Sequence, residues 1–307
     1  MKALLDSLEN LEPQESSEVA LLDAFIADYA QTYTLSSEDF PRLMSLLVQN
    51  RIYNAKWQYG TATKPHLVRV LQTVRILARA PPLIARFIAA NGVQFLCQKL
   101  HEVTSQSQRQ QEFPEEICDL LIELSSILYK TVRTVGPEHR ALIQQHVLTE
   151  DILSDLQILL AVRHNVLLKC IFESILTIFE FAQEGTEARI DSYFCNKFTV
   201  DKLLVILETF SDDFRVLAAE TLTHLLRGAG QADQVRIFKD LGGSEKLMSL
   251  LMTTSAHSEQ LKVRLLACLQ TLTSGENQDI LQELFDLGAI HLLLNLLVQT
   301  SKETAES

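Results

Sequence analysis

Five runs of the sequence place apolar residues at intervals of three and four positions. They are VRVLQTVRILA (68–78), CDLLIELSSIL (118–128), KCIFESILTIF (169–179), RVLAAETLTHL (215–225) and VRLLACLQTLT (263–273). This spacing predicts amphipathic helices, each with one buried stripe. Successive runs begin about 47 to 50 residues apart, and a repeat of this length indicates stacked helical units that cannot bury their apolar faces alone.

A second pattern joins a short apolar run to another run through a glycine. It occurs in IFKDLGGSEKLMSLL (237–251), in LFDLGAIHLLLNLL (284–297) and, more weakly, in FIAANGVQFLCQKL (87–100), where Gly92 holds the glycine position. Each copy predicts a helix, a left-handed stop and another helix that turns away. The candidates for the helix after the stop are 38–48, 93–103, 150–160, 199–209, 243–253 and 289–299.

Each unit therefore contains three helices, with the long periodic run as the third. Ser36 or Ser37, Thr149 and Ser211 are helix-start signals before three of the predicted helices. No Asn-Gly or Asp-Gly turn joins alternating strands. We expect an all-α fold in one domain over 1–299, with an N-terminal helical cap at about 1–33, an insertion loop at 51–66 and a flexible tail at 300–307.

These features resemble the armadillo helical-repeat family. The resemblance rests on the Asp-Leu-Gly copies with their following leucine-rich runs and on the third helices, and it covers the chain from about residue 17 to 299. It implies a right-handed α-solenoid of about five units whose third helices line a concave face. HEAT-type units stay open for the middle copies, which lack the glycine around His146–Thr149 and Lys197–Thr199.

The third helices depart from the peptide-binding members of that family, such as the nuclear-import adaptors. There a tryptophan and an asparagine in each third helix hold an extended peptide. Here the asparagine position holds Ile76, Ser126, Thr177, His224 and Thr271, and the tryptophan position holds Gln72, Ile122, Glu173, Glu220 and Ala267. A threonine replaces an asparagine amide poorly and an isoleucine not at all, so any concave-face site uses other contacts.

The composition fits a globular intracellular protein. The chain has 307 residues, 47% of them hydrophobic, with ten glycines and seven prolines. No segment reaches the roughly 18 uninterrupted apolar residues that span a bilayer, and Asp6 and Glu9 break the first apolar stretch, which excludes a signal peptide. The five dispersed cysteines indicate reduced, buried thiols. We expect a cytoplasmic location, with the nucleus as the second choice.

The sequence contains no catalytic pattern. GAGQAD (228–233) lacks the preceding strand of a nucleotide-binding loop, and no Cys-x-x-Cys or His-Glu-x-x-His spacing offers a metal site. No serine or cysteine lies in a recognisable nucleophile motif. We expect a protein that is not an enzyme and that needs no cofactor or metal.

Charge is distributed unevenly along the chain, whose formal net charge is −12. Residues 1–39 contain nine acidic residues and one lysine, whereas residues 40–101 contain nine basic residues and no acid. Such an uneven distribution of charge gives information about binding partners and not about the fold. The insertion loop lies within the basic segment and carries Trp57, the only tryptophan of the chain, and long loops in compact repeats are often functional.

The basic segment supplies the first candidate binding site. Its residues are Arg51, Lys56, Trp57, Lys64, Arg69, Arg75, Arg79 and Arg86. Arg75 and Arg79 are one helical turn apart and point the same way, whereas Arg69 lies about 100° or more away from them. The second candidate site is the concave face, with Glu173, Thr177, Glu220, His224 and Thr271.

Two explanations of the basic segment stay open. Its side chains pair with the chain's own acidic N-terminal residues, or they form a surface for an acidic partner. On the second explanation the protein is a scaffold or adaptor that binds a segment of a partner protein. The alternative is binding of nucleic acid or of an anionic membrane surface, which a protein of net charge −12 disfavours. Oligomeric state is not determined by these patterns.

Overall fold

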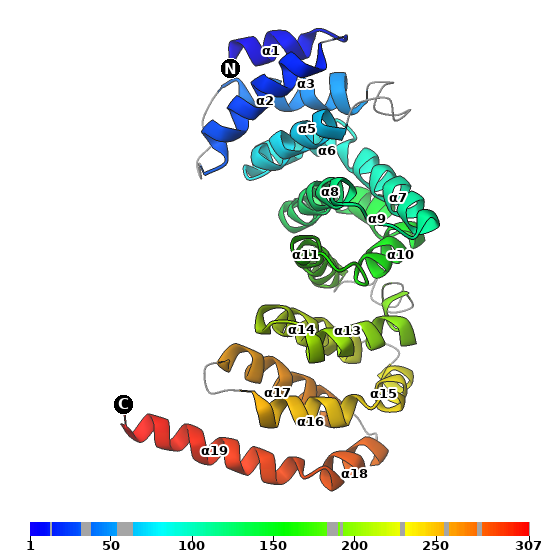
Figure 1. Ribbon diagram of the computed structural model, residues 1–307, viewed down its shortest axis with the longest axis vertical. Coiled ribbons are helices and arrows are strands. Elements are labelled where there is room, and N and C mark those ends of the chain that lie inside the picture. Colours follow the sequence, from blue (N-terminus) through cyan, green and yellow to red (C-terminus); the bar gives the residue numbers. More distant parts are fainter. Residues whose placement is uncertain are drawn as a thin grey trace. The chain divides into compact units, whose positions relative to one another are not determined.

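The computed structural model describes residues 1–12, 14–31, 38–53, 64–182, 190, 193–227, 231–254, 258–274 and 278–306. Within these residues every regular element is helical, which confirms the predicted all-α fold. The chain forms two compact units, Met1–Phe181 and Ala182–Ser307. Figure 1 shows the helices of each unit stacked in sequence order.

Long helices recur through both units at the predicted interval. They are α2 (Glu15–Tyr29), α5 (Lys64–Leu77), α8 (Glu115–Thr134), α11 (Asn165–Ala182), α14 (Asp212–Arg227) and α17 (Glu259–Ser274). The five periodic runs lie in the last five of these helices, so these third helices are confirmed. In α5 the stripe of Val70, Val74 and Leu77 is fully buried, as the spacing of the apolar residues requires.

Helix α2 was expected to form part of an N-terminal cap, but it lies in the position of a third helix. It begins at Glu15, 49 residues before the first residue of α5, Lys64. It packs alongside α5 as α5 packs alongside α8. The sequence concealed this because apolar residues surround most of α2 and one of its buried positions holds a charged side chain, Glu18.

The helices that precede the third helices also agree with the predicted runs. They are α3 (Phe40–Leu46) with the π-helical η1 (Leu47–Ile52), α7 (Gly92–Gln110), α10 (Glu150–Leu159), α13 (Lys197–Thr209), α16 (Gly243–Thr253) and α19 (Ala289–Glu306). Thr149 caps α10 as expected, because its hydroxyl accepts a hydrogen bond from the Ile152 amide at 3.4 Å. Ser36 and Ser37 lie outside the described residues.

Short helices complete the array, and they are α1 (Lys2–Glu9), α6 (Pro81–Ala89), the 3-10 turn η2 (Pro137–His139), α9 (Arg140–Val147), α15 (Gln231–Asp240) and α18 (Gln278–Asp286). The bounds of two expected segments, the tail and the insertion loop, differ from the structure. Helix α19 continues to Glu306, past the start of the expected tail. Both ends of the expected insertion loop are helical, since η1 ends at Ile52 and α5 begins at Lys64.

The glycine junction between first and second helices depends on two adjacent residues with different tasks. The first is left-handed: Gly242 has φ 68° and Gly288 has φ 82°. In the third copy this residue is Asn91, with φ 60°, and not Gly92 as predicted. The second residue must be small, because a Cβ on Gly243 or on Gly92 would lie 2.4 Å from the ring of Phe238 or Phe87.

In the copy at 284–297 the two residues at these positions of the junction are different. Ala289 follows Gly288, and Leu284 stands where the other two copies have phenylalanine. A smaller neighbour leaves room for the alanine methyl group. Two combinations therefore fill the junction: a glycine with a phenylalanine (Gly243 and Phe238), or an alanine with a leucine (Ala289 and Leu284).

Replacing Gly243 with alanine is expected to destabilise unit 2 by about 1–3 kcal/mol, because the methyl group overpacks against Phe238. The change is measured as a lower urea midpoint. The double variant Gly243→Ala/Phe238→Leu should lose less than the two single variants together. Strictly additive losses would show that the ring does not set the size of residue 243.

Candidate functional site

Arg51 belongs to a buried ion cluster and not to a binding surface. Its Nε and Nη2 donate to the two carboxylate oxygens of Glu18, both at 2.6 Å, and His66 Nε2 lies 2.8 Å from Glu18 Oε1. Arg51 is 1% exposed and Glu18 is fully buried. The guanidinium also donates to the carbonyls of Ser7 and Asn10, which ties η1 to α1. Arg51 is therefore removed from the candidate partner-binding set.

Burial alone would raise the pKa of Glu18, but the hydrogen bonds from Arg51, His66 and Ser7 outweigh it. The pKa of this carboxyl falls to about 2. Glu18 is thus ionised at every pH at which the fold is expected to persist. The cluster links α2, η1 and α5 through one buried charge.

Most bases of the segment 40–101 pair with the chain's own acids. Arg42 pairs with Glu9, Arg51 with Glu18, Lys64 with Glu116, Arg69 with Asp23, Arg75 with Glu123 and Lys99 with Glu102. Three of the six pairs reach acids of residues 1–39, which pack beside this segment. Self-pairing therefore explains much of the charge asymmetry. Lys56 and Trp57 lie outside the described residues, and Arg86 is exposed on α6.

Arg75 and Arg79 come together with a base that the sequence reading did not identify, Lys130 of α8. Arg75 Nε donates to Glu123 Oε2 at 2.6 Å, and Lys130 Nζ donates to the Arg75 carbonyl at 3.5 Å. Arg79 Nη1 donates to the Tyr29 carbonyl at 3.3 Å. We name Arg75, Arg79 and Lys130 the basic cluster. Glu123 accepts from Arg75, and the charges of Arg75, Arg79 and Glu123 all act on Lys130.

The electrostatics of the basic cluster show an excess of positive charge. Burial and the positive charges of Arg75 and Arg79 lower the pKa of Lys130 to about 8, although Glu123 acts in the opposite direction. Burial raises the pKa of Glu123, and Arg75 partly offsets this effect. The charges of Arg75 and Arg79 thus act on Lys130 more strongly than the charge of Glu123 does, and a further anion beside Lys130 would relieve this repulsion.

The two threonine candidates of the concave face are more buried than expected. Thr177 is 8% exposed and Thr271 is 4% exposed. The Thr271 hydroxyl donates to the Ala267 carbonyl of its own helix and accepts from Arg227 Nε at 3.3 Å. Thr271 is thus a packing residue, whereas Thr177 also lines the pocket described below.

The remaining candidates of this face are half-buried. Glu220 pairs with Arg264 at 3.1 Å within unit 2, and Glu173 and His224 are partly accessible on α11 and α14. Glu173 belongs to unit 1, whereas Glu220 and His224 belong to unit 2. Of the concave-face candidates, Glu173 and Thr177 lie in the same unit as the basic cluster.

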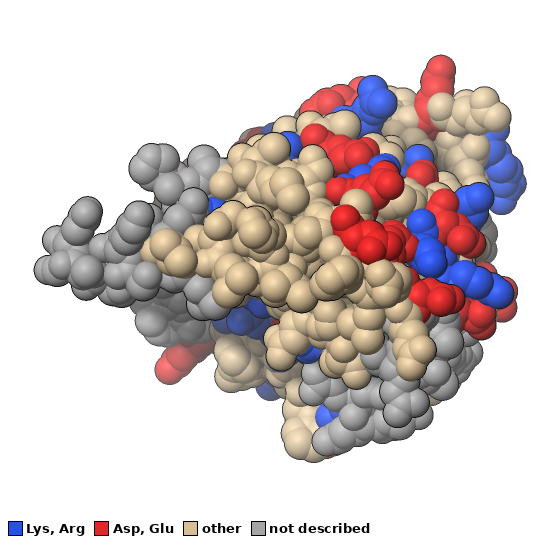
Figure 2. All heavy atoms as spheres, turned by 90° about the horizontal axis from the view of Figure 1, so that it is seen from below, with Lys and Arg blue, Asp and Glu red and all other residues tan. Residues whose placement is uncertain are grey.

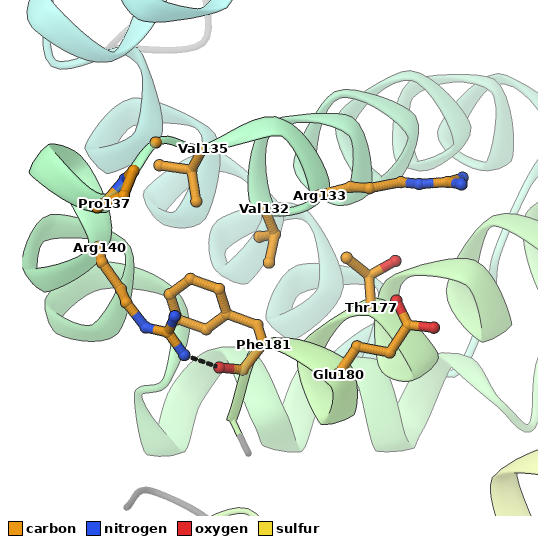
Figure 3. A pocket seen from close by; sticks show the side chains of 9 residues that line it. Val132, Arg133, Val135, Pro137, Arg140, Thr177, Glu180 and Phe181 are labelled. Carbon is orange, nitrogen blue, oxygen red and sulfur yellow. Dashed lines mark hydrogen bonds between the residues drawn. The ribbon is translucent and has the colours of Figure 1, made fainter. Parts of the chain in front are cut away.

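A pocket of about 250 Å³ opens beside the C-terminal turns of α8 and α11 (Figure 3). Val132, Val135, Pro137 and Phe181 form its apolar side, and Arg133, Thr177 and Glu180 form the other side. Arg140 closes the wall, because it donates to the Phe181 carbonyl at 2.7 Å and stacks 4.7 Å from the ring centroid. Lys130 and Arg133 are three residues apart on α8, so the basic cluster and the pocket share one helix face.

The sequence analysis identified neither Lys130 nor the pocket. Lys130 lies one turn after Ser126 on α8, outside the two positions at which the import adaptors hold a peptide. The pocket combines residues of α8, η2, α9 and α11, which no single motif connects. Reading every third helix one turn further would have identified Lys130.

The described residues offer little for catalysis. All five cysteines are free thiols, and burial raises the pKa of Cys97 to about 12 and that of Cys268 to about 11, which keeps both thiols protonated. Among the described residues no group of three or more His, Cys, Asp or Glu side chains is arranged to hold a metal ion. None of the described helices is long and apolar enough to cross a membrane.

Comparisons with known proteins support the fold. No model of a protein family and no curated protein matches the sequence. Among solved structures, a designed armadillo repeat protein has a TM-score of 0.60 at 15% identity, with 88% of this chain and 99% of that chain covered. An engineered protein from a structural genomics programme has a TM-score of 0.61 at 14% identity, with 90% and 100% covered.

A further designed armadillo repeat protein, solved in complex with a peptide described as (KR)4, has a TM-score of 0.57 at 15% identity and covers 88% of this chain and 99% of its own. At these identities the likeness concerns the fold alone. The chain therefore adopts an armadillo-type helical-repeat fold, as the sequence resemblance implied.

Replacing Glu18 with glutamine is expected to destabilise unit 1 by about 3–5 kcal/mol, because Arg51 is left as a buried charge without its counter-ion. Chemical unfolding monitored by circular dichroism measures the loss. Glu9→Gln, which removes an exposed partner of Arg42, is the matched control and should cost less than about 1 kcal/mol.

The same carboxyl predicts a dependence of stability on pH. Because the pKa of Glu18 is lowered from 4.5 to about 2 in the folded protein, its contribution is present above pH 4.5 and is lost as the pH falls toward 2. Urea midpoints recorded over this range should decline more steeply for the native protein than for Glu18→Gln. Parallel curves would contradict the assignment.

Proposed function

We propose that the protein is a non-enzymatic scaffold that binds an acidic segment of a partner protein on the third helices of unit 1. The observation that carries the proposal is the basic cluster, where the Lys130 ammonium donates to the Arg75 carbonyl and lies among the positive charges of Arg75 and Arg79. The side chains of Arg75, Arg79 and Lys130 are half-buried. A carboxylate from a partner therefore meets them in partly desolvated surroundings, where ion pairs are stronger than at an open surface.

The neighbouring pocket defines the second part of the site. Its apolar wall of Val132, Val135 and Phe181 suits one aliphatic or aromatic side chain, and its volume of about 250 Å³ limits what it can accept. Because Lys130 and Arg133 connect the two parts along α8, the preferred ligand carries an acidic residue close to an apolar residue. Arg75 is already held by Glu123, so we expect Lys130 to supply the main new ion pair, with the positive charge of Arg79 beside it.

A protein segment fits these features better than a polyanion does. Binding of nucleic acid draws on rows of bases that neutralise successive phosphates, whereas the cluster holds three bases and one acid. A net charge of −12 further repels a polyanion. Binding of a peptide is also supported by the designed armadillo repeat protein of similar fold that was solved in complex with the peptide (KR)4, a basic sequence.

The first test measures binding of a fluorescein-labelled peptide of alternating glutamate and leucine by fluorescence anisotropy. Arg79→Glu/Lys130→Glu should weaken binding by at least about tenfold, the effect of losing about 1.4 kcal/mol. The control Arg236→Glu/Lys262→Glu changes the net charge equally but lies in unit 2, and it should bind as the native protein does.

Two outcomes would overturn the proposal. Equal losses in both double variants would mean that only net charge matters. Tighter binding of single-stranded DNA or of phosphatidylserine vesicles, with a steep loss of affinity as salt rises, would favour the polyanion alternative.

The affinity for the acidic peptide is also expected to depend on pH through Lys130. Its pKa of about 8 means that the ammonium deprotonates as the pH rises through that value, so affinity should fall between pH 7 and 9. The other groups facing Lys130 are Arg75, Arg79, Glu123 and Cys170, and burial raises the pKa of the Cys170 thiol. Lys130→Arg keeps its charge throughout, and a profile as steep as that of the native protein would contradict the role of Lys130.

A further inference from the structure

Helices α18 and α19 of unit 2 carry a continuous apolar surface that faces solvent. Its residues are Leu281 and Phe285 of α18 and Ile290, Leu293, Leu294 and Val298 of α19, and we name this set the α18–α19 face. Phe285 is 60% exposed, Ile290 56% and Leu294 55%. Figure 2 looks onto this part of the molecule and shows a broad surface without charged residues, with the charges gathered along one side.

On both helices the residues of the face lie beside buried residues and are themselves exposed. On α18, Ile280 and Leu284 are buried, whereas Leu281 and Phe285 lie one turn apart on the outer side. On α19, Ala289 is buried and residues 290, 293, 294 and 298 recur at helical intervals. Each helix therefore packs part of its apolar surface within unit 2 and leaves the rest open.

Helix α16, the counterpart of α19, buries the corresponding positions: Ser244, Leu247 and Met248 stand where α19 exposes Ile290, Leu293 and Leu294. The exposed residues of α16 include a charged one, Glu245. By contrast, the sequence from Leu287 to Ser301 contains no charged residue. An exposed, charge-free apolar stripe of this length marks an interaction surface.

We infer that the α18–α19 face is the interface through which two copies of this chain associate as a two-fold dimer. The absence of charge on the face is the first argument for a second copy. Two molecules of net charge −12 repel each other, and they can approach at least cost through a surface that adds no like-charged contacts. A two-fold axis places the same stripe on both sides of the interface, so an apolar stripe is complementary to itself.

The size of the face is the second argument. Large apolar side chains exposed to this degree present, as a set of six, on the order of 500 Å². Homodimer interfaces are about 65% apolar, so this apolar area corresponds to an interface of about 800 Å² per partner, the size that supports a stable complex. When α19 pairs with α19 of the second copy, the apolar stripe of one copy packs against the same stripe of the other.

The proposal is independent of the basic cluster, which lies in unit 1. The test is sedimentation velocity of the full chain from about 1 to 200 µM, a range over which a dimer of moderate affinity dissociates by mass action. The native protein should shift from monomer to dimer. Leu294→Glu, which places a carboxylate within the face of both copies, should remain a monomer over the whole range.

Met252→Glu is the matched control, because Met252 of α16 is also 59% exposed but is not a member of the face. It introduces the same charge and should dimerise as the native protein does. Circular dichroism melts check that both variants stay folded. A native protein that is monomeric at 200 µM, or equal dissociation of both variants, would falsify the proposal. Monomers that float with neutral phosphatidylcholine vesicles would instead assign the face to a lipid surface.

Discussion

Within each compact unit the structure depends on the burial of an apolar stripe of one third helix against the neighbouring third helix, as α5 packs against α8 and α14 against α17. No single repeat can bury its apolar stripe alone, so each repeat is stable only beside a neighbouring repeat. This constraint explains why the interval between successive third helices stays between 47 and 51 residues although the connecting segments differ. It also explains why α2, which lacks a clear amphipathic pattern, lies in the same row: α5 needs a partner on that side.

The packing between third helices also determines which polar side chains are accessible to a partner. A side chain that points between two third helices must be satisfied there, as Thr271 is by the carbonyl of Ala267 and by Arg227. Side chains at the ends of these helices escape the packing, and there Arg75, Arg79 and Lys130 gather with the pocket beside Phe181. In unit 1 the potential for recognition thus lies toward the C-terminal ends of the third helices.

The repeat interval, the helix order and the positions of most helices followed from the sequence because periodicity reports burial directly. The left-handed residue of the 87–100 copy was misplaced by one position, since the pattern shows where a glycine occurs but not whether it supplies a backbone angle or room for a ring. Arg51 was misassigned for a related reason: composition registers a charge, whereas its burial depends on Glu18, 33 positions earlier. The basic cluster combined two predicted arginines with a lysine 55 positions after Arg75 that only the fold brings near.

The buried contact of Glu18 with Arg51 and His66 has a consequence for the order in which the chain assembles. Helices α1 and α2 leave the ribosome before η1 and α5, yet a carboxylate cannot lose its water until both of its counterparts arrive. Burial of Glu18 is therefore coupled to the arrival of Arg51 and His66, so α1 and α2 reach their full packing only together with η1 and α5.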